Sequence, residues 1–372
     1  MNISFVSDAI YPYNKGGKEK RLYELSTRLS KLGHDVHVYT MHWWDTAETV
    51  RIENGVHLHA ISKCYPMYSG DKRSIKEGVM FGLACLKLIR IKFDIMDVDQ
   101  MPFFPVYSTW LICRIRGKKL YGTWHEALSR NDWRRYMGAL GNLAYAIEDI
   151  TIRLPDIISS SSAQTIDGLN MIHGRYENVK LVTPGIDLAS ISSVKPAKIA
   201  SDIIYIGRLV KDKNVDKLIL AVALLSKKDT SISCTIIGHG VEKDNLIRLI
   251  KRMKLEHNVR LLQPLEKDTE IYSHIKAAKV FCLPSIREGF GMAVLESLAC
   301  GTPVVTSAAQ ANSARHLIEE GRNGSIVNEG IDNLALALEE WLNKPKPYNI
   351  ADQVKHYDWN ALAKKQEAVY LS

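Results

Sequence analysis

Short apolar runs alternate with longer amphipathic segments along most of the chain. In the first half, five apolar runs have the length and the flanking turns that predict buried parallel strands. Between them, Glu19–Leu32 and Met137–Arg153 have the spacing of helices. Alternation of strand and helix indicates a doubly wound α/β sheet. The five predicted strands are Ile3–Ser7, Val36–Tyr39, Phe93–Val98, Lys119–Thr123 and Ile157–Ser160.

The alternation pauses once and then begins again. Residues 190–200 are rich in Ser, Lys and Ala, which is typical of a linker. A second series of apolar runs follows, again with helical segments between them. We therefore predict two Rossmann-like domains, at residues 1–180 and 190–350. The strands predicted in the second domain are Ile203–Gly207, Ser233–Ile237, Val259–Leu262, Val280–Leu283 and Pro303–Thr306.

Length and composition agree with this division and exclude several classes of protein. A chain of 372 residues with 46% hydrophobic residues is long enough for two domains with separate cores. The net charge of +8 is shared between the halves without a basic tail, so it suits phosphate groups but does not indicate nucleic-acid binding. The six cysteines stand singly and form no zinc or disulfide pattern.

The N-terminus starts directly in a predicted strand and lacks the pattern of a signal peptide. The longest apolar stretch, residues 79–91, is interrupted by Lys87 and Arg90 and is too short to span a bilayer. We expect a cytoplasmic protein. Contact with the inner face of a membrane is left open, because cations flank this stretch and can meet anionic lipid. Cations that are merely solvated on a helix explain the pattern equally well. They are Lys72, Arg73, Lys76, Lys87, Arg90 and Lys92.

The most informative segment is residues 284–305, PSIREGFGMAVLESLACGTPVV. A predicted strand ends in a loop that carries Glu288, and glycines at 289 and 291 allow a tight turn and close approach to a ligand. A helix is predicted from Met292 to Ala299. The loop follows the carboxyl end of a parallel strand, where open α/β sheets bind ligands. The free amides at the start of the helix suit a phosphate, whereas Glu288 and Glu296 suit neutral hydroxyls.

This segment resembles the E-x7-E signature of the retaining nucleotide-sugar glycosyltransferases of family GT4, which have the GT-B fold. The resemblance implies that Glu288 contacts hydroxyls of the transferred sugar and Glu296 the ribose of the nucleotide. It also implies that the amides of Gly289, Phe290, Gly291 and Met292 face the diphosphate. The alternative is a surface acid at an ordinary helix N-terminus.

A second signal follows the first strand of the second domain, in GRLVKDK at residues 207–213. Arg208 and Lys213 lie five residues apart, so both cations can reach over one strand end, where they favour phosphate. The segment is similar to the G-R-L-x-x-x-K element of the family, in which these two residues hold the diphosphate. Solvated surface cations are the alternative. The loop with Pro264 and Leu265 corresponds, by position only, to the segment that contacts the base.

Two features of the first domain belong to the same resemblance. Gly16 and Gly17 follow the first strand and are similar to the Gly-Gly loop near donor phosphate and acceptor. His125 follows a predicted strand, where related enzymes place a histidine beside the transferred sugar, and a hydrogen-bonded loop histidine is its alternative. Glu126 is a candidate for contacting the acceptor. The family also implies that residues 351–372 form a crossover helix that returns to the first domain. Further histidines are interpreted as structural, namely His34, His57, His59 and His173.

The resemblance implies transfer of a sugar from a UDP- or GDP-sugar to a saccharide, a lipid-linked or a small-molecule acceptor, with retention of configuration, in the making of a cell-surface glycan or glycolipid. No Asp-x-Asp pair stands at a suitable loop, so we expect no metal ion and no resident cofactor. Two alternatives stay open at this point. One is a nucleotide-sugar epimerase of the same fold, and the other is a non-catalytic protein that binds nucleotide sugars.

Overall fold

The chain folds into two compact units. The computed structural model describes residues 1–69, 72–174 and 177–372. Unit 1 comprises Met1–Pro184 together with Trp359–Ser372, and unit 2 comprises Gly185–Asp358. The return to unit 1 comes eight residues later than the expected position 351, because Ile350 and Val354 are buried in the core of unit 2.

Unit 1 contains an eight-stranded sheet in the order β10-β9-β8-β7-β1-β2-β4-β3, in which only the β3–β4 pair is antiparallel. A separate two-stranded ribbon pairs β5 with β6. Because β1 pairs with β2 on one side and with β7 on the other, the direction of winding reverses at β1. The strands are β1 (Asn2–Val6), β2 (Asp35–Met41), β3 (Val50–Glu53), β4 (Val56–Ser62), β5 (Tyr68–Ser69), β6 (Lys72–Arg73), β7 (Ile95–Asp99), β8 (Leu120–Trp124), β9 (Ile157–Ser160) and β10 (Val179–Leu181).

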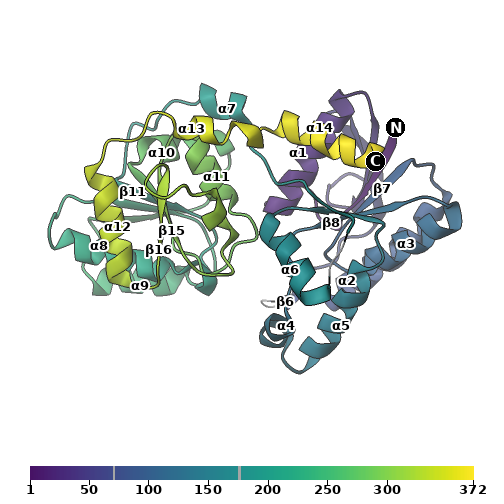
Figure 1. Ribbon diagram of the computed structural model, residues 1–372, viewed down its shortest axis with the longest axis horizontal. Helices are drawn as coiled ribbons and strands as arrows, with labels where there is room; N and C mark the ends of the chain where they lie inside the picture. Colours follow the sequence, from purple (N-terminus) through teal and green to yellow (C-terminus); the bar gives the residue numbers. More distant parts are fainter. Residues whose placement is uncertain (70–71, 175–176) are drawn as a thin grey trace. The chain divides into compact units, whose positions relative to one another are not determined.

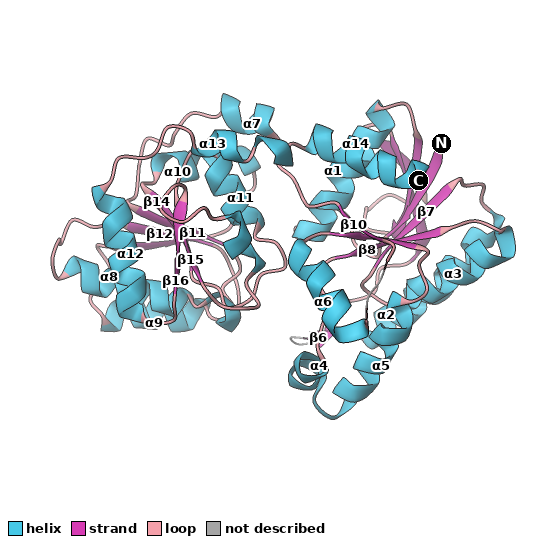
Figure 2. Ribbon diagram, in the orientation of Figure 1, coloured by secondary structure: helices cyan, strands magenta, loops and turns pink. Residues whose placement is uncertain are grey.

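Helices cover both faces of this sheet (Figures 1 and 2). Leu22 and Leu29 of α1 and Val369 and Tyr370 of α14 belong to the core on one face, although α14 lies at the far end of the chain. Residues of α2 and α3 pack on the other face. The helices are α1 (Gly17–Lys31), α2 (Ile75–Cys85), α3 (Phe104–Arg116), α4 (Arg130–Met137), α5 (Gly141–Ile152), α6 (Ala163–His173) and α14 (Trp359–Leu371).

Unit 2 has an all-parallel sheet in the order β13-β12-β11-β14-β15-β16. Its winding reverses between β11 and β14. Helices α8, α9 and α12 cover one face, and α10, α11 and α13 cover the other (Figure 2). The strands are β11 (Ile203–Ile206), β12 (Cys234–Ile237), β13 (Val259–Leu262), β14 (Val280–Leu283), β15 (Val304–Ser307) and β16 (Gly324–Val327). The helices are α7 (Leu188–Ser193), α8 (Val215–Ser226), α9 (Lys243–Arg252), α10 (Asp268–Ala277), α11 (Met292–Ala299), α12 (Ile331–Asn343) and α13 (Ile350–Gln353).

The predicted α/β architecture with two parallel sheets is confirmed, and the helix at Met292–Ala299 has the predicted bounds. Two local predictions are wrong. The helix expected over 137–153 is shorter and covers only Gly141–Ile152 (α5), because the chain turns after α4 at Gly138, which has a positive φ of 62°. The expected linker at 190–200 starts within α7, because Ile191 is buried in the core of unit 2. Six strands were not predicted, namely β3, β4, β5, β6, β10 and β16.

Candidate functional site

In unit 2, the loops that follow β11 and β14 are joined at the carboxyl end of the sheet. The amide of Ile286 donates to the carbonyl of Asp212 over 2.9 Å, and the side chain of Asn214 donates to the carbonyl of Pro284 over 3.1 Å. The two strands are neighbours in the sheet, so their loops lie together at the point where the winding reverses. Open α/β sheets bind ligands at this point.

Lys213 and Glu288 meet between these loops. The ammonium of Lys213 lies 2.5 Å from Oε1 of Glu288 and 3.4 Å from the carbonyl oxygen of Arg287. Each side chain is 13% exposed, so the pair is shielded but reachable. The backbone of Glu288 is also fixed, because its amide donates to the carbonyl of Ala311 and its carbonyl accepts from the amide of Ser313. The two residues predicted from separate motifs thus form one ion pair.

Helix α11 begins beside this pair, at Met292, and Gly291 is its N-cap residue. This glycine has a φ of 92°, and a Cβ built on it would overlap the Cβ of Ala314. A side chain would therefore strain the backbone and clash, which explains the glycine. No side chain in the described part of the chain caps the helix, so the amides at its start, before that of Val294, remain available to an anion. Glu296 lies about one turn further on, and its Oε1 is 3.5 Å from the hydroxyl of Tyr272.

The remaining predicted residues of unit 2 lie on the neighbouring loops. Arg208 follows β11 and has an exposed side chain, while its carbonyl accepts a 2.8 Å hydrogen bond from the hydroxyl of Tyr205. In the loop after β13, Pro264 is exposed and Leu265 packs partly against the core. Gly289 and Phe290 are half-buried in the loop before α11. An exposed arginine, a shielded lysine–glutamate pair and an open helix N-terminus together suit a ligand that has both phosphate and hydroxyl groups.

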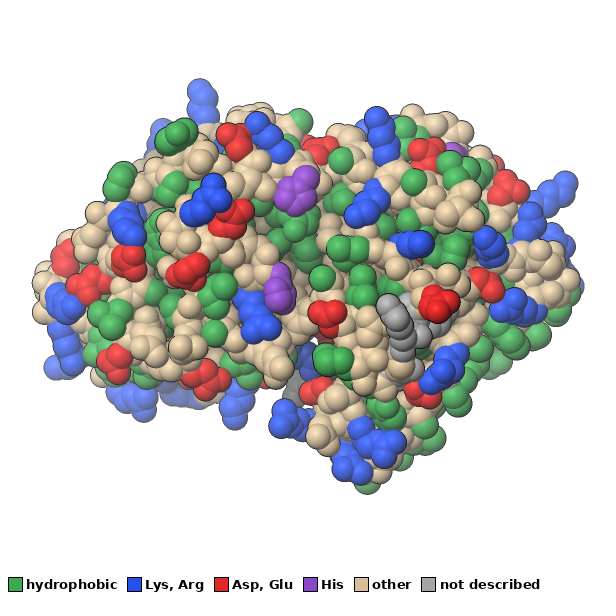
Figure 3. Space-filling view, in the orientation of Figure 1, with side chains coloured by type: hydrophobic (Ala, Val, Ile, Leu, Met, Phe, Trp, Pro, Cys, Tyr) green, Lys and Arg blue, Asp and Glu red, His purple; other side chains and the backbone are tan. Residues whose placement is uncertain are grey.

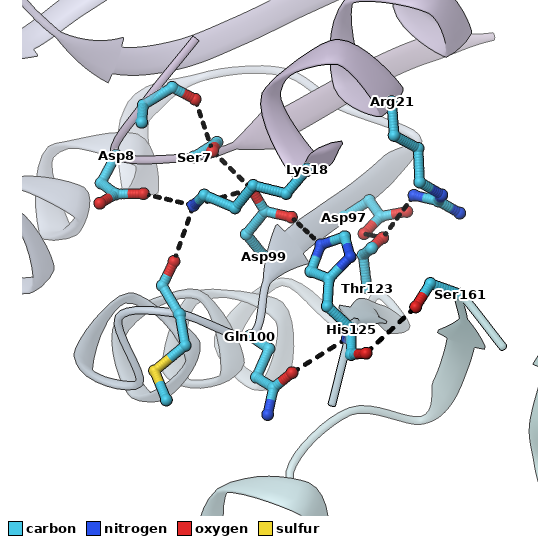
Figure 4. A network of polar contacts seen from close by, with 12 residues as sticks. Ser7, Asp8, Lys18, Arg21, Asp97, Asp99, Gln100, Thr123, His125 and Ser161 are labelled. Carbon is cyan, nitrogen blue, oxygen red and sulfur yellow. Dashed lines mark hydrogen bonds and ion pairs between the residues drawn. The ribbon is translucent and has the colours of Figure 1, made fainter. Parts of the chain in front are cut away.

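Unit 1 has a different cluster of polar side chains, at the carboxyl ends of β1, β7 and β8 (Figure 4). Nε2 of His125 lies 3.3 Å from Oδ1 of Asp99, and the hydroxyl of Ser7 lies 2.5 Å from Oδ2 of the same carboxylate. Gln100 holds the backbone beside the histidine, because its Oε1 accepts from the amide of His125 over 3.0 Å and its Nε2 donates to the carbonyl of Glu126 over 2.7 Å. These residues surround the point at which the sheet of unit 1 reverses its winding.

Lys18 is the counter-ion of this cluster. Its ammonium lies 2.6 Å from Asp8 and 3.5 Å from Asp99, and it donates to the carbonyl of Met101 over 3.0 Å. Asp8 also pairs with Arg73 over 2.5 Å. Arg73 is therefore paired with a buried carboxylate and is not a surface cation for lipid. It was predicted to be one of the cations that flank residues 79–91. The sequence pattern gave no indication of Asp8, Asp99 or Lys18, which come from separate segments.

Burial and charge partners shift the acids of unit 1 in opposite directions. Burial alone raises the pKa of Asp99, but Lys18 and the hydrogen bonds from His125 and Ser7 outweigh it and hold this pKa well below its usual range. Burial raises the pKa of Asp97 to about 6, although hydrogen bonds from Tyr370 and Thr123 oppose the change. Burial and the nearby charge of Asp8 raise the pKa of Glu77 to about 7.

The other residues predicted in unit 1 have mainly structural surroundings. Gly16 caps α1 and Gly17 is its first residue. The hydroxyls of Ser161 and Thr165 donate to the carbonyl of His125 over 3.2 and 3.0 Å, which fixes this loop from the β9 side. His34 contacts Glu367 of α14, as expected of a structural histidine. The side chain of His173 lies outside the described part of the chain. Within that part, no three His, Cys, Asp or Glu side chains are grouped to hold a metal ion, and no helix has the length and apolar character needed to cross a membrane.

Two family models match the chain in succession. Residues 15–190 match Glycosyltransferase Family 4, and residues 193–357 match Glycosyl transferases group 1. A glycogen synthase of Mycobacterium tuberculosis is 25% identical over 397 residues, which cover 100% of this chain and 95% of the relative.

Solved structures of low sequence identity share the fold. Sucrose-phosphate synthase from Thermosynechococcus elongatus has a TM-score of 0.81 at 16% identity, covering 100% of this chain and 98% of that one. The Anabaena protein Alr3699/HepE, solved in complex with UDP and glucose, has a TM-score of 0.72 at 18% identity, covering 99% of this chain and 98% of that one.

Proposed function

The chain belongs to the GT4 family of glycosyltransferases with the GT-B fold, and on that premise we propose that it transfers a sugar from a UDP- or GDP-sugar, with retention of configuration and without a metal ion. The Lys213–Glu288 pair beside the open N-terminus of α11 is the observation that carries the proposal. Both motifs of unit 2 meet there. The Anabaena neighbour solved with UDP and glucose favours uracil as the base of the donor.

Each group at this site has a role that follows from its charge. Arg208, Lys213 and the amides at 289–292 attract the diphosphate. Glu288 would repel phosphate, so it binds hydroxyls of the transferred sugar, and Glu296 binds the ribose. As the glycosidic bond breaks, negative charge grows on the departing diphosphate. The cations and the helix N-terminus then stabilise the transition state more than the ground state, which is the role a metal ion has elsewhere.

Retention follows if the acceptor attacks the face from which the diphosphate leaves. A departing phosphate oxygen takes the proton of the acceptor hydroxyl, the new glycosidic bond forms to the acceptor oxygen, and the nucleotide diphosphate is released. By resemblance to the family, His125 lies beside the transferred sugar, and Gly16 and Gly17 lie near the donor phosphate. Glu126, the next residue after His125, is the candidate for contacting the acceptor. We propose a saccharide, a lipid-linked or a small-molecule acceptor used in a cell-surface glycan or glycolipid.

The proposal is tested by thermal unfolding of the purified protein with UDP, GDP or ADP, each with and without EDTA. Saturation at a hundredfold excess over Kd stabilises a protein by about 2.7 kcal/mol, or roughly 5–10 °C for a domain of this size. We expect one nucleotide to give such a shift, unchanged by EDTA. Arg208→Ala should abolish it. Lys211→Ala removes an exposed cation of the same turn and should keep the shift, so it is the matched control.

Other outcomes would contradict parts of the proposed function. No shift with any nucleotide, or an equal shift in Arg208→Ala, would remove the diphosphate role of this site. A shift that disappears with EDTA would contradict metal independence. Incubation with the sugar nucleotide alone tests the first alternative, because a new epimer identifies an epimerase. Measurable transfer of the sugar to an added acceptor would exclude a non-catalytic protein.

A second observation supports contact of unit 1 with an anionic membrane surface. Helices α2 and α3 and the turn after α2 carry exposed apolar side chains next to exposed cations, and Figure 3 shows hydrophobic side chains along this margin. Cosedimentation with phosphatidylglycerol vesicles, but not with phosphatidylcholine vesicles, is expected, and equal recovery from both would contradict it. The apolar residues are Ile75, Leu83, Leu86, Leu111 and Ile115, and the cations are Lys76, Lys87 and Arg90.

A further inference from the structure

The side chain of His125 has one described hydrogen-bond partner, the carboxylate of Asp99. Oδ1 of Asp99 lies 3.3 Å from Nε2 of the imidazole, and the histidine side chain is 23% exposed. The backbone of His125 is held separately, by Gln100 at its amide and by Ser161 and Thr165 at its carbonyl. Only the orientation of the ring and the position of its proton are therefore left for Asp99 to determine.

Asp99 is itself immobilised as a carboxylate. The hydroxyl of Ser7 contacts its Oδ2 at 2.5 Å, and the ammonium of Lys18 lies 3.5 Å from the same oxygen. Lys18 is anchored in turn by Asp8 and by the carbonyl of Met101. Figure 4 shows that these groups approach Asp99 from β1 and α1, whereas His125 approaches it from the loop after β8. A carboxylate with a cation and a hydroxyl donor on one side remains ionised and accepts hydrogen bonds on the other.

An ionised carboxylate requires a proton on the nitrogen that faces it. We propose that Asp99 is a positioning residue that holds His125 in its Nε2–H tautomer, so that Nδ1 offers a lone pair to a hydroxyl of the bound sugar. A neutral imidazole has one donor and one acceptor nitrogen, and the bond made by one nitrogen decides the role of the other. In this form His125 accepts a hydrogen bond from a sugar hydroxyl and does not attract a phosphate.

The identity of the hydroxyl rests on the proposed function, because it assumes that His125 contacts the transferred sugar. The tautomer and its dependence on Asp99 do not rest on it. The two parts can therefore be tested separately, the first by kinetics and the second by a spectroscopic measurement that requires no substrate.

The tautomer is measured on the full-length 15N-labelled protein, with long-range 1H–15N correlation spectra of the imidazole nitrogens at pH 8. The variant His125→Gln assigns the signal by its loss. We expect a pyridine-type shift for Nδ1 and a pyrrole-type shift for Nε2. The opposite pattern, or rapid exchange between the two tautomers in the unmodified protein, would overturn the proposal.

The dependence on Asp99 is tested with Asp99→Asn. An asparagine can turn its amide and donate to Nε2, so the preference for the Nε2–H tautomer should be lost. Asp97→Asn is the matched control, because Asp97 lies two residues earlier on β7, is also buried, and contacts Thr123 and Tyr370 instead of His125. Its His125 signals should keep the original pattern. If Asp99→Asn does not fold, Ser7→Ala is used instead, because it removes the hydroxyl that contacts Oδ2 of Asp99. The spectrum of His125 should then show a partial loss of the preference for the Nε2–H tautomer.

The kinetic part uses whichever nucleotide sugar the protein hydrolyses or transfers. Loss of a hydrogen bond to a charged group lowers a rate constant that depends on it by about 10- to 100-fold. We therefore expect kcat of Asp99→Asn to fall by about that factor, and KM for the donor to change less than about threefold. A normal tautomer with normal kcat in Asp99→Asn would overturn the positioning role. An altered tautomer with unchanged kcat would keep the positioning of His125 and remove its contact with the sugar.

Discussion

At the scale of single residues, neighbouring acids of unit 1 behave differently because their partners differ. Asp97 and Asp99 stand two residues apart on β7, and both are at most 9% exposed. Lys18 keeps Asp99 ionised, whereas Asp97 has mainly hydroxyl partners and its pKa rises to about 6 through burial. Burial by itself therefore does not decide the charge of a carboxyl group. The charges and hydrogen-bond donors around the carboxyl group decide it together with burial.

The carboxyl group of Glu77, on α2, is buried in an unfavourable environment, and this supports a prediction of how stability depends on pH. It is fully buried, neither carboxylate oxygen has a hydrogen-bond partner among the described residues, and its pKa is raised to about 7. The unfolded chain binds fewer protons at this group than the folded chain between pH 4.5 and 7. Stability due to Glu77 is therefore complete below about pH 4.5 and is lost as the pH rises through about 7.

We predict that Glu77→Gln stabilises the protein at pH 8 by about 2 kcal/mol, because glutamine has no charge to bury. At pH 5, where Glu77 is mostly protonated, the difference should be close to zero. Urea unfolding at both pH values measures this, and Glu48→Gln, at an exposed glutamate, is the control. Equal effects of Glu77→Gln at pH 5 and pH 8 would show that its charge is not the cause.

At the scale of elements, the start of α11 meets a structural requirement and matches the anion-binding role proposed for it. Its glycine at the N-terminus lets the chain pass close to Ala314 and leaves the amides of the first turn uncapped. A capping side chain would satisfy one of those amides and occupy the space proposed for the diphosphate. The same residue thus permits the packing and keeps the helix N-terminus open.

Gly291→Ala is predicted to lose about 2–4 kcal/mol of stability, because a positive φ and a steric overlap act together. Gly301→Ala is the matched comparison. Gly301 has a φ of 73°, but an added Cβ would meet nothing within 4 Å, so only the backbone cost of about 1 kcal/mol is expected. Chemical denaturation of both variants gives the difference. Similar losses would mean that the contact with Ala314 contributes nothing.

At the scale of the whole molecule, unit 1 is completed by the end of the chain. Helix α14 packs beside α1, and three of its polar contacts reach the interior: the hydroxyl of Tyr370 donates to Asp97 over 2.6 Å, its carbonyl accepts from Tyr121 over 3.2 Å, and Gln366 donates to Ser159 over 3.1 Å. The sheet of unit 1 therefore lacks part of its cover until the last residues are folded.

Tyr370→Phe removes one donor from the buried carboxyl of Asp97 and is predicted to destabilise unit 1 by about 1–3 kcal/mol. Hydrogen exchange followed by mass spectrometry should show faster exchange in β7 and β8 and no change in β14 and β15, because those strands belong to unit 2. Tyr348→Phe, at a fully exposed tyrosine, should change neither unit. Faster exchange in both units of Tyr370→Phe would contradict the assignment of α14 to unit 1.

The local pattern of the chain was sufficient for much of the fold and for the site in unit 2. Strand periodicity located the two parallel sheets, and glycines and acids at short spacing located the loop before α11. These features depend on residues that are close in sequence, so the spacing predicts their geometry. The motif residues Lys213 and Glu288 proved to be partners because both follow neighbouring strands of one sheet.

Only the tertiary structure decided the charge network of unit 1 and the end of the second unit. Asp8, Lys18, Arg73, Asp99 and His125 come from five separate segments, and no periodicity relates them. Likewise, the chain leaves unit 2 at Asp358 because Ile350 and Val354 bury their side chains there. A sequence pattern reports which residues avoid water or favour a turn. Which buried charge meets which partner depends on how distant segments pack, because burial in a low dielectric makes each carboxylate depend on its nearest cation.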